Sequence, residues 1–483
     1  MGKKREEVFP GKIVVGRETE IAKLNELIEN TNADLVMVYG RRRVGKTYVI
    51  KNTYGRHIDF HFTGGKLTES GEHLDQWAIK LNEVAAGKMH YEMPANWMQA
   101  FRQLKNYLST IRATKRRIVF LDEVPWLDKH KSGFLAALEY HWNDWMTNQN
   151  LILLLCGSAT SWMFKNIMNN AAGLHNRVTR HLKMVPFTLA ETEKFLLWKK
   201  IKWTKAEIIT AYMALGGIPY YLEQLRFDKS AIQNIDALLF DPTGELKNEF
   251  QNLYRSLFDN YPAYEAVVKA IATKRKGLTR SEIIAITKIE NGGGLSKIIT
   301  ELEECSFIES YIPYGKKTQN SLYHLTDEYT AFYFHFNPLN KGKGSFVTIS
   351  QSSTYKSWAG YAFENICMRH KNKIAAALGI SGVFFTTPSF YYKGDADSGA
   401  CQIDMLIDRA DNVINICEMK YHNTQYEFSK KEMEAAQNRI EKFKQLTGTK
   451  KQLLYTLVTS NGLKPNQYSI GTIANAIEAK ELF

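Results

Sequence analysis

The chain has 483 residues, of which 44% are hydrophobic and 23% charged, and its formal net charge is +13. This composition is typical of a soluble globular protein, the length predicts about three domains, and the basic balance favours a polyanionic partner, namely nucleic acid and in particular DNA. No apolar run approaches the roughly 20 residues of a membrane span, and no secretory signal follows the charged residues 1–7, so we expect a cytoplasmic protein with no membrane partner. The five cysteines include no C-x-x-C pair, so we expect no zinc site.

The first candidate site lies near the N-terminus. Residues 35–39 form a β-rich apolar run that predicts a buried strand, and residues 40–47 follow it with the spacing G-x-x-x-x-G-K-T. In such a loop, backbone N–H groups and the next helix N-terminus surround phosphate oxygens, the lysine reaches the β- and γ-phosphates, and the threonine binds Mg²⁺. The alternative is a glycine-containing turn with a basic surface run. The predicted nucleotide-binding residues are Gly40, Arg43, Gly45, Lys46 and Thr47, and Thr47 is also a predicted metal ligand.

Residues 118–123 predict a second buried strand, which ends in two acids. Ligands of a parallel sheet bind beyond the carboxyl ends of its strands. We therefore expect Asp122 to hold Mg²⁺, directly or through water, and Glu123 to polarise the attacking water. An ordinary strand followed by an acidic surface turn is the alternative.

A third apolar strand is predicted at residues 151–156, and Ser158 follows it. The Ser158 hydroxyl is a candidate for sensing the γ-phosphate or orienting water, and equally a candidate for capping the next helix. Further along, Arg177 and Arg180 are candidates for an arginine finger that neutralises charge in the transition state, although each also fits a solvated basic segment. Of the two, Arg177 is the predicted nucleotide contact.

Two short segments resemble a known family. Val-Gly-Arg-Glu at residues 15–18 resembles the opening box of AAA+-type ATPases, and Gly-Gly-Ile-Pro-Tyr-Tyr-Leu at residues 216–222 resembles a lid segment of archaeal-type ATPases related to STAND proteins. The resemblance implies ATP as the nucleotide and self-association through the ATPase core. It also implies an α/β fold in four parts. These are a P-loop NTPase core with a parallel sheet (residues 1–187), a helical lid (188–258), a winged helix-turn-helix (259–338) and a restriction-endonuclease-like domain (345–483).

The region after the lid has the pattern of a winged helix-turn-helix. Helices are predicted at about residues 264–273, 280–287 and 295–305, and strands at 307–312 and 322–325 enclose a basic turn. Lys297, Lys316 and Lys317 are the candidates for phosphate contact. The third helix also carries three glutamates, which would repel phosphates, so packing against another protein domain is the alternative. Those glutamates are Glu301, Glu303 and Glu304.

A second candidate site follows a basic linker at residues 340–345. Strands are predicted at residues 402–407 and 413–420, and alternation along the second strand places Glu418 and Lys420 on one face. We expect Asp404 to meet Glu418 and bind Mg²⁺ with it, and a helix at residues 358–364 to add Glu364 as a third metal ligand. Lys420 would then orient or deprotonate the attacking water.

This constellation resembles the PD-(D/E)xK nuclease-like fold, with Gln437 as an extra polar residue on a helix at residues 430–446. It departs from the pattern at Ile403, where that fold carries proline. A similar fold with surface acids and no catalysis is the alternative.

Two functions remain open from the sequence. The first is a Mg²⁺-dependent ATPase that couples hydrolysis to a nuclease-like domain acting on DNA. The alternative is a STAND-like, nucleotide-dependent regulatory switch whose winged helix and nuclease-like domain only bind partners or DNA. A DNA-binding regulator that never hydrolyses nucleotide is disfavoured by Glu123.

Overall fold

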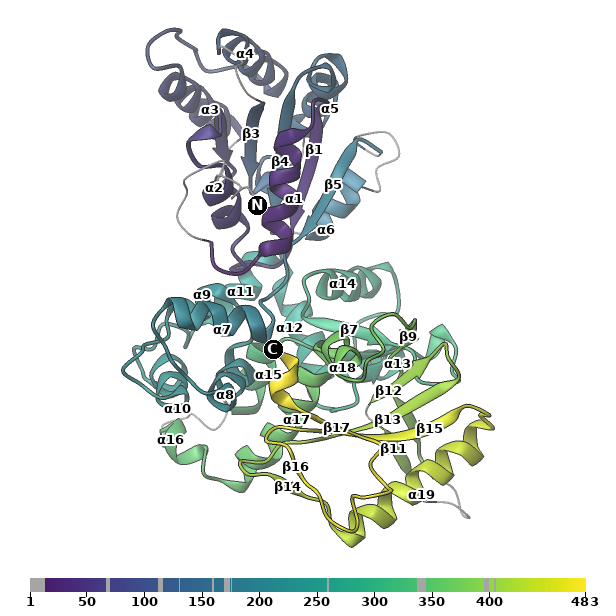
Figure 1. The fold of residues 1–483 in the computed structure, drawn as a ribbon. Coiled ribbons are helices and arrows are strands. Elements are labelled where there is room, and N and C mark those ends of the chain that lie inside the picture. The colour runs from purple at the N-terminus through teal and green to yellow at the C-terminus, as the bar shows by residue number, and fades with distance from the viewer. Residues whose placement is uncertain are drawn as a thin grey trace, which may run out of the picture. The chain divides into compact units, whose positions relative to one another are not determined.

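The computed structural model describes residues 14–66, 70–111, 116–129, 131–158, 160–168, 174, 176–258, 260–336, 345–394, 399–403 and 405–483. Within it the chain forms two compact units, of which the first ends at Val185 and the second runs from Pro186 to Phe483 (Figure 1). The predictions for residues 1–7, for residues 340–344 of the linker and for Asp404 lie outside the described residues. None of the helices in the described part combines the length and the apolar character that a bilayer crossing requires.

The first unit is built on a five-stranded parallel sheet with the order β2-β3-β4-β1-β5. Every residue of β1 and β4 is buried, as predicted for apolar strands of a parallel sheet covered on both faces. The strands predicted at residues 35–39 and 151–156 are confirmed, and the strand predicted at residues 118–123 ends one residue earlier, at Asp122. The strands are β1 (Asp34–Tyr39), β2 (Phe60–Thr63), β3 (Arg117–Asp122), β4 (Leu151–Gly157) and β5 (Val178–Lys183), and the helices are α1 (Glu18–Glu29), α2 (Lys46–Tyr54), α3 (Ser70–Ala85), α4 (Trp97–Thr110), α5 (Phe134–Asp144) and α6 (Thr160–Met163).

Aromatic side chains hold three of these helices against the sheet. The ring of Trp77 on α3 lies 5.1 Å from Phe62 of β2 and 5.4 Å from Trp97 of α4, in each case edge to face. Trp97 in turn lies 4.9 Å from Phe134 of α5. Such pairs add roughly 0.5–1.5 kcal/mol each to the area that they bury. The β2 end of the sheet is therefore fixed firmly to α3, α4 and α5.

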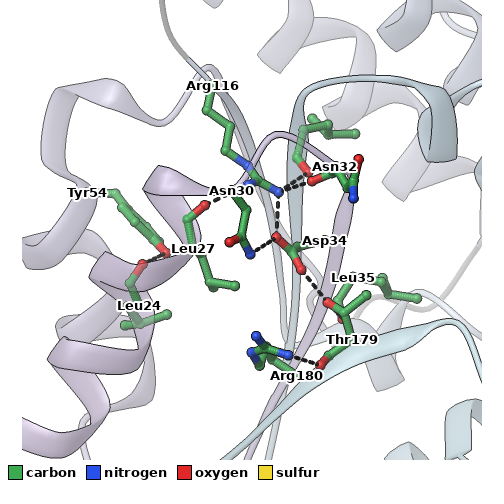
Figure 2. A network of polar contacts seen from close by, with 11 residues as sticks. Leu24, Leu27, Asn30, Asn32, Asp34, Leu35, Tyr54, Arg116, Thr179 and Arg180 are labelled. Carbon is green, nitrogen blue, oxygen red and sulfur yellow. Dashed lines mark hydrogen bonds and ion pairs between the residues drawn. The ribbon is translucent and has the colours of Figure 1, made fainter.

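A buried polar network closes the amino edge of the same sheet (Figure 2). Arg116 Nη2 donates to Asp34 Oδ2 at 2.5 Å, and the Thr179 hydroxyl donates to Asp34 Oδ1 at 2.7 Å. Arg116 also donates to the carbonyls of Leu27 and Leu151. Burial lowers the pKa of the Arg116 guanidinium, and Asp34 opposes that shift. The network joins α1, β1, β4 and β5 at the edge opposite the carboxyl ends of the strands.

The second unit begins with short helices, three of which open with capping boxes at Thr188, Thr204 and Ser230. Gly217 packs directly on Phe187, because Phe187 N donates to the Gly217 carbonyl at 2.6 Å and a Cβ on Gly217 would lie 1.9 Å from the Phe187 oxygen. The helices are α7 (Leu189–Trp198), α8 (Lys205–Leu215), α9 (Pro219–Glu223), α10 (Ala231–Ile235) and α11 (Glu249–Leu257).

The next segment contains the predicted helices and strands in the predicted order. Three helices, α12 to α14, are followed by strands β7 and β8. A short strand between the first two helices, β6, joins them in an antiparallel sheet of order β6-β8-β7. Glu301 faces inward, is 7% exposed, and accepts a hydrogen bond from the Tyr264 hydroxyl. The elements are α12 (Tyr261–Ile271), β6 (Leu278–Thr279), α13 (Arg280–Thr287), α14 (Gly293–Glu304), β7 (Ile308–Tyr311) and β8 (Leu322–Leu325).

Four helices connect this segment to the C-terminal sheet. They are α15 (Glu328–Phe336), α16 (Phe346–Ile349), α17 (Ser353–Arg369) and α18 (Lys371–Ala377). Arg369 Nη1 lies 2.8 Å from the buried Glu328 carboxylate, and Leu189 N donates to His370 Nε2 at 3.1 Å. These contacts tie α7, α15 and α17 together inside the second unit.

The C-terminal sheet is mixed, with the order β17-β15-β13-β12-β9. β13 pairs parallel with β15 and antiparallel with β12. The strand predicted at residues 402–407 is instead two strands, because β11 pairs with β10 in a separate small sheet. The elements are β9 (Phe385–Thr386), β10 (Phe390–Tyr392), β11 (Cys401–Ile403), β12 (Met405–Arg409), β13 (Val413–Lys420), β14 (Tyr426–Glu427), α19 (Lys430–Thr447), β15 (Gln452–Thr459), β16 (Leu463–Lys464) and β17 (Asn475–Glu478).

Candidate nucleotide-binding site

The loop between β1 and α2 has a backbone that few residues other than glycine tolerate. Gly40 has φ 141°, and a Cβ at this position would lie 2.1 Å from the Met184 carbonyl oxygen. Gly45 has φ 89° and Arg43 has φ 71°, both in the left-handed region. Lys46 is buried, and its Nζ donates to the carbonyls of Gly40 and Arg41, each at 2.9 Å. The ammonium group therefore lies inside the loop that its motif predicts to cradle phosphate.

Arg17 connects the N-terminal Val-Gly-Arg-Glu segment to this loop. Its side chain is 1% exposed, and its Nη2 donates to the Val44 carbonyl at 3.1 Å. Arg17 also lies 3.7 Å from Glu20 on α1. The segment thus contacts the phosphate-binding loop through the buried Arg17 side chain, a role that its sequence motif alone did not predict.

Two oxygen donors suited to a magnesium ion meet beside the loop. The Thr47 hydroxyl at the start of α2 donates to Asp122 Oδ2 at 2.7 Å. Asp122 Oδ1 accepts from the Glu123 backbone N–H at 3.0 Å. A hydroxyl and a carboxylate are the ligands that Mg²⁺ takes in phosphate-transfer sites, so the residues present fit this ion.

Glu123 is held by Ser158. The residue has φ 48°, in the left-handed region, directly after β3. The Ser158 hydroxyl, just beyond β4, donates to its carboxylate at 2.9 Å and 3.2 Å. The Ser158 hydroxyl is therefore bound to the Glu123 carboxylate, a contact that neither of the two sequence alternatives named.

Arg177 lies at the other end of the sheet, and Arg180 lies in the first half of β5. β5 runs parallel to β1, and its first residue, Val178, pairs with Leu35 near the start of β1. The phosphate-binding loop follows the carboxyl end of β1, about 17–20 Å away for a strand of this length. Both arginines are exposed, and Arg180 donates to the Thr179 carbonyl. The structure does not bring Arg177 to the loop of its own chain.

The second predicted site contains a network of charges on one face of β13. Lys420 Nζ lies 2.8 Å from Glu418 Oε1, and Arg439 Nη1 lies 2.5 Å from Glu418 Oε2. Arg439 also donates to the Tyr455 hydroxyl at 3.1 Å, and burial followed by the Glu418 charge raises the pKa of Tyr455. The sequence reasoning missed Arg439. Arg439 lies three residues after Ala436, a core position of α19, so the helical repeat could have predicted that both side chains share one face of the helix.

Glu364 belongs to α17, which packs against the opposite face of β13. The ring of Phe363 on α17 lies 5.7 Å from the ring of Tyr421, which directly follows β13. In an extended chain Tyr421 projects opposite to Lys420 and Glu418. No group of three or more metal-ligating side chains occurs among the described residues, which do not include Asp404. The described part of the chain thus does not join Glu364 to Glu418 in a metal site.

Comparison with known proteins agrees with the first site. Residues 14–225 match the family model described as an ATPase domain predominantly from Archaea. An uncharacterized protein of Methanocaldococcus jannaschii, MJECL04, is 26% identical over 365 residues, which are 73% of this chain and 76% of that protein. The similarity to this family model thus covers the P-loop, both acids at the carboxyl end of β3 and the Gly-Gly-Ile-Pro segment at residues 216–219.

Two solved structures show partial similarity to this chain. The Walker-type ATPase PABY2304 of Pyrococcus abyssi is 20% identical, with a TM-score of 0.49, over 68% of this chain and 98% of that chain. The ORC2 protein of Aeropyrum pernix, solved as ADPNP–ADP complexes, is 14% identical, with a TM-score of 0.38, over 70% of this chain and 98% of that chain.

Proposed function

We propose that the first unit binds ATP with Mg²⁺ and hydrolyses it between the P-loop and the carboxyl end of β3. One observation carries the proposal: the Thr47 hydroxyl and the Asp122 carboxylate are in contact at 2.7 Å, directly beside Glu123. This arrangement brings two cation ligands and a candidate water-orienting carboxylate next to a lysine-containing phosphate loop. The family match over residues 14–225 supports the same function.

Each side chain of the site has a separate task in this proposal. Lys46 exchanges the carbonyls of Gly40 and Arg41 for oxygens of the β- and γ-phosphates. Glu123 accepts a hydrogen bond from the attacking water, and Ser158 keeps that carboxylate in position. A bound Mg²⁺ would neutralise the charge that develops on the phosphates.

Phosphate release by the purified full chain tests this proposal. We expect turnover of ATP in Mg²⁺ but not in EDTA, and a loss of turnover in Asp122→Asn. Asp75→Asn, at an exposed position on α3, is the matched control and keeps full turnover. Absence of nucleotide binding by the wild-type chain, or equal turnover in Asp122→Asn, would contradict the proposal.

We further propose that ATP turnover is coupled to the second unit, acting on DNA. The order of α12 to β8 fits a winged helix-turn-helix, whose exposed Lys297, Lys316 and Lys317 are available to phosphates. Glu418 and Lys420 on one face of β13, 2.8 Å apart, fit the metal-dependent nuclease-like centre predicted with Asp404. The net charge of +13 is consistent with a polyanionic partner.

One observation favours the alternative of a regulatory switch. The Glu418 carboxylate already has two cationic partners, Lys420 and Arg439, and a metal ion would have to displace at least one of them. Incubation of single- and double-stranded DNA with the chain, Mg²⁺ or Mn²⁺, and ATP separates the two functions. Cleavage that disappears in Asp404→Ala supports the nuclease, whereas DNA binding without cleavage, together with slow ADP release, supports the switch.

Self-association belongs to the same proposal. Arg177 is exposed at the edge of the sheet away from its own loop, so as an arginine finger it would act on the loop of a neighbouring copy. Turnover per chain should then rise with protein concentration in the wild type and stay constant in Arg177→Ala. A concentration-independent wild-type rate would contradict this assignment.

A further inference from the structure

Strand β2 brings a polar pair to the side of the site that carries Asp122. Thr63 is the last residue of β2, and it pairs in register with Asp122 of β3. Residues that pair in register in a parallel sheet project from the same face. The backbone continues this contact, since Gly64 N donates to the Asp122 carbonyl at 2.9 Å. Thr63 is therefore the neighbour of Asp122 on the β2 side.

Two side-chain contacts show that this is the face on which the cation ligands lie. Two residues earlier on each strand, the rings of His61 and Phe120 stack at 4.7 Å, so the two strands do share the orientation of their side chains. The alternating residue Phe62 packs on Trp77 of α3, so His61 and Thr63 project from the opposite face, where the Thr47 hydroxyl of α2 meets Asp122. Thr63, His61 and Asp122 thus lie on the α2 side of the sheet.

The chemistry of the pair suits the hydration shell of a cation. Thr63 is exposed, and its Oγ1 lies 3.1 Å from His61 Nε2. Burial, and then the positive charge of Lys51, lowers the pKa of His61 to about 4, so its ring is neutral near pH 7. A neutral imidazole with one nitrogen on the hydroxyl fixes the direction of the remaining hydroxyl lone pairs without adding a positive charge beside the cation.

We propose that Thr63 is a positioning residue of the nucleotide site: its hydroxyl, oriented by His61, hydrogen-bonds the water shell of the cation held by Thr47 and Asp122. This inference rests on the proposed ATPase function and extends it to a strand that carries no phosphate-binding motif. Thr63 would act through cation-bound water, because Asp122 and Thr47, which are in contact, would supply the direct ligands. Outer-shell partners of this kind typically change metal affinity or activity by about 10–100-fold when they are removed.

The test measures how strongly Mg²⁺ improves nucleotide binding, independently of turnover. ADP affinity is determined by calorimetric titration of the full chain at a series of Mg²⁺ concentrations and in EDTA. In Thr63→Val we expect unchanged affinity in EDTA and an increase of about tenfold in the Mg²⁺ concentration that gives half of the full effect. Thr63→Ser restores the hydroxyl and should restore the wild-type response.

Two further variants complete the experiment. His61→Phe keeps the ring on Phe120 but removes the nitrogen, and should shift the Mg²⁺ requirement in the same direction as Thr63→Val. Thr110→Val, at the end of α4, removes a hydroxyl that donates to the Tyr107 carbonyl of its own helix and should leave the requirement unchanged.

The outcomes separate this inference from the function on which it rests. A wild-type Mg²⁺ response in Thr63→Val overturns the assignment of Thr63 while leaving the ATPase proposal intact. Equal losses in Thr63→Val and Thr63→Ser, or a loss already present in EDTA, show a structural role and also overturn it. A wild-type chain whose ADP affinity does not respond to Mg²⁺ removes the proposed magnesium site itself.

Discussion

Lys46 and Glu123 are both engaged by neighbours that nucleotide or water would have to replace or share. The lysine ammonium is bound by two carbonyls of its own loop, and the glutamate carboxylate by the Ser158 hydroxyl. A charged side chain that neighbouring groups already hold in place loses less conformational entropy when it binds a ligand. The two residues therefore make separable contributions, one to binding and one to turnover.

The Lys46→Ala variant should bind ATP about 2–4 kcal/mol more weakly, because it loses two charge-assisted contacts to phosphate. Isothermal titration measures this loss directly. Lys51→Ala removes an exposed lysine from the same helix and should bind ATP nearly as the wild type does. Equal affinity of Lys46→Ala and the wild type would refute the assignment of the loop.

The Glu123→Gln variant should bind ATP with Mg²⁺ normally but turn it over at least roughly a hundredfold more slowly, because an amide is a poor acceptor of the proton of water. Single-turnover phosphate release distinguishes this from a binding defect. Glu92→Gln, at an exposed position outside the site, serves as the control. A Glu123→Gln rate close to that of the wild type would mean that another group orients the water.

Among the elements, the residue that follows β1 lies so close to the residue that follows β5 that no side chain fits between their backbones. Met184 N donates to the Tyr39 carbonyl at 2.7 Å, and the Met184 carbonyl lies against the Cα of Gly40. The phosphate loop begins at this contact, so its first glycine is required both by φ and by the approach of the chain that leaves β5.

The Gly40→Ala variant should lower the free energy of unfolding of the first unit by more than about 3 kcal/mol, because its Cβ would overlap the Met184 oxygen. Gly87→Ala provides the comparison: its φ is 77°, nothing lies near a Cβ there, and the expected cost is about 1–2 kcal/mol. Denaturant unfolding measures both values. A Gly40→Ala cost no larger than that of Gly87→Ala would show that the β5 end moves away at little cost.

The contact of α7 with α17 depends on a neutral histidine. His370 Nε2 accepts from the Leu189 N–H, and Nδ1 faces the Ile366 carbonyl at 2.8 Å. Burial lowers the pKa of His370 to about 4, and the charges of Arg369 and Lys373 act in the same direction. A histidine whose folded pKa lies below its unfolded pKa of about 6.5 stabilises the fold above that pH, and this stability is lost as pH falls toward the folded pKa.

The second unit should therefore lose up to about 3 kcal/mol of stability from this group between about pH 6.5 and pH 4. In His370→Gln the slope of unfolding free energy against pH in that window should become flatter, although the variant is less stable at pH 7. Urea unfolding at several pH values measures the slope. An unchanged slope would show that other groups, such as His335 with its lowered pKa, dominate the acid response.

For the molecule as a whole, the strands, loops and helices that contiguous residues determine could be predicted from the sequence. The strand, loop and helix around Gly40–Thr47 and the strand ending at Asp122 follow from local apolar runs and a fixed spacing, and the β13 and α19 bounds follow from periodicity. Features that depend on the topology could not be read from contiguous residues. The place of Arg177 depends on the direction of β5, and the partners of Glu418 depend on how α19 lies on the sheet. The separation of β11 from β12 likewise depends on pairing between distant segments.

Coupling between the two compact units can be measured by their separate unfolding transitions. A ligand at 100 times its dissociation constant stabilises the unit that binds it by about 2.7 kcal/mol. If ATP binding is coupled to the second unit, ATP with Mg²⁺ should raise the transition temperatures of both units in scanning calorimetry, because the ligand then favours one joint arrangement. Lys46→Ala should abolish both shifts. A shift confined to the transition of the first unit would show that the two units respond independently, and the ATPase would then not drive the domain that carries Glu418.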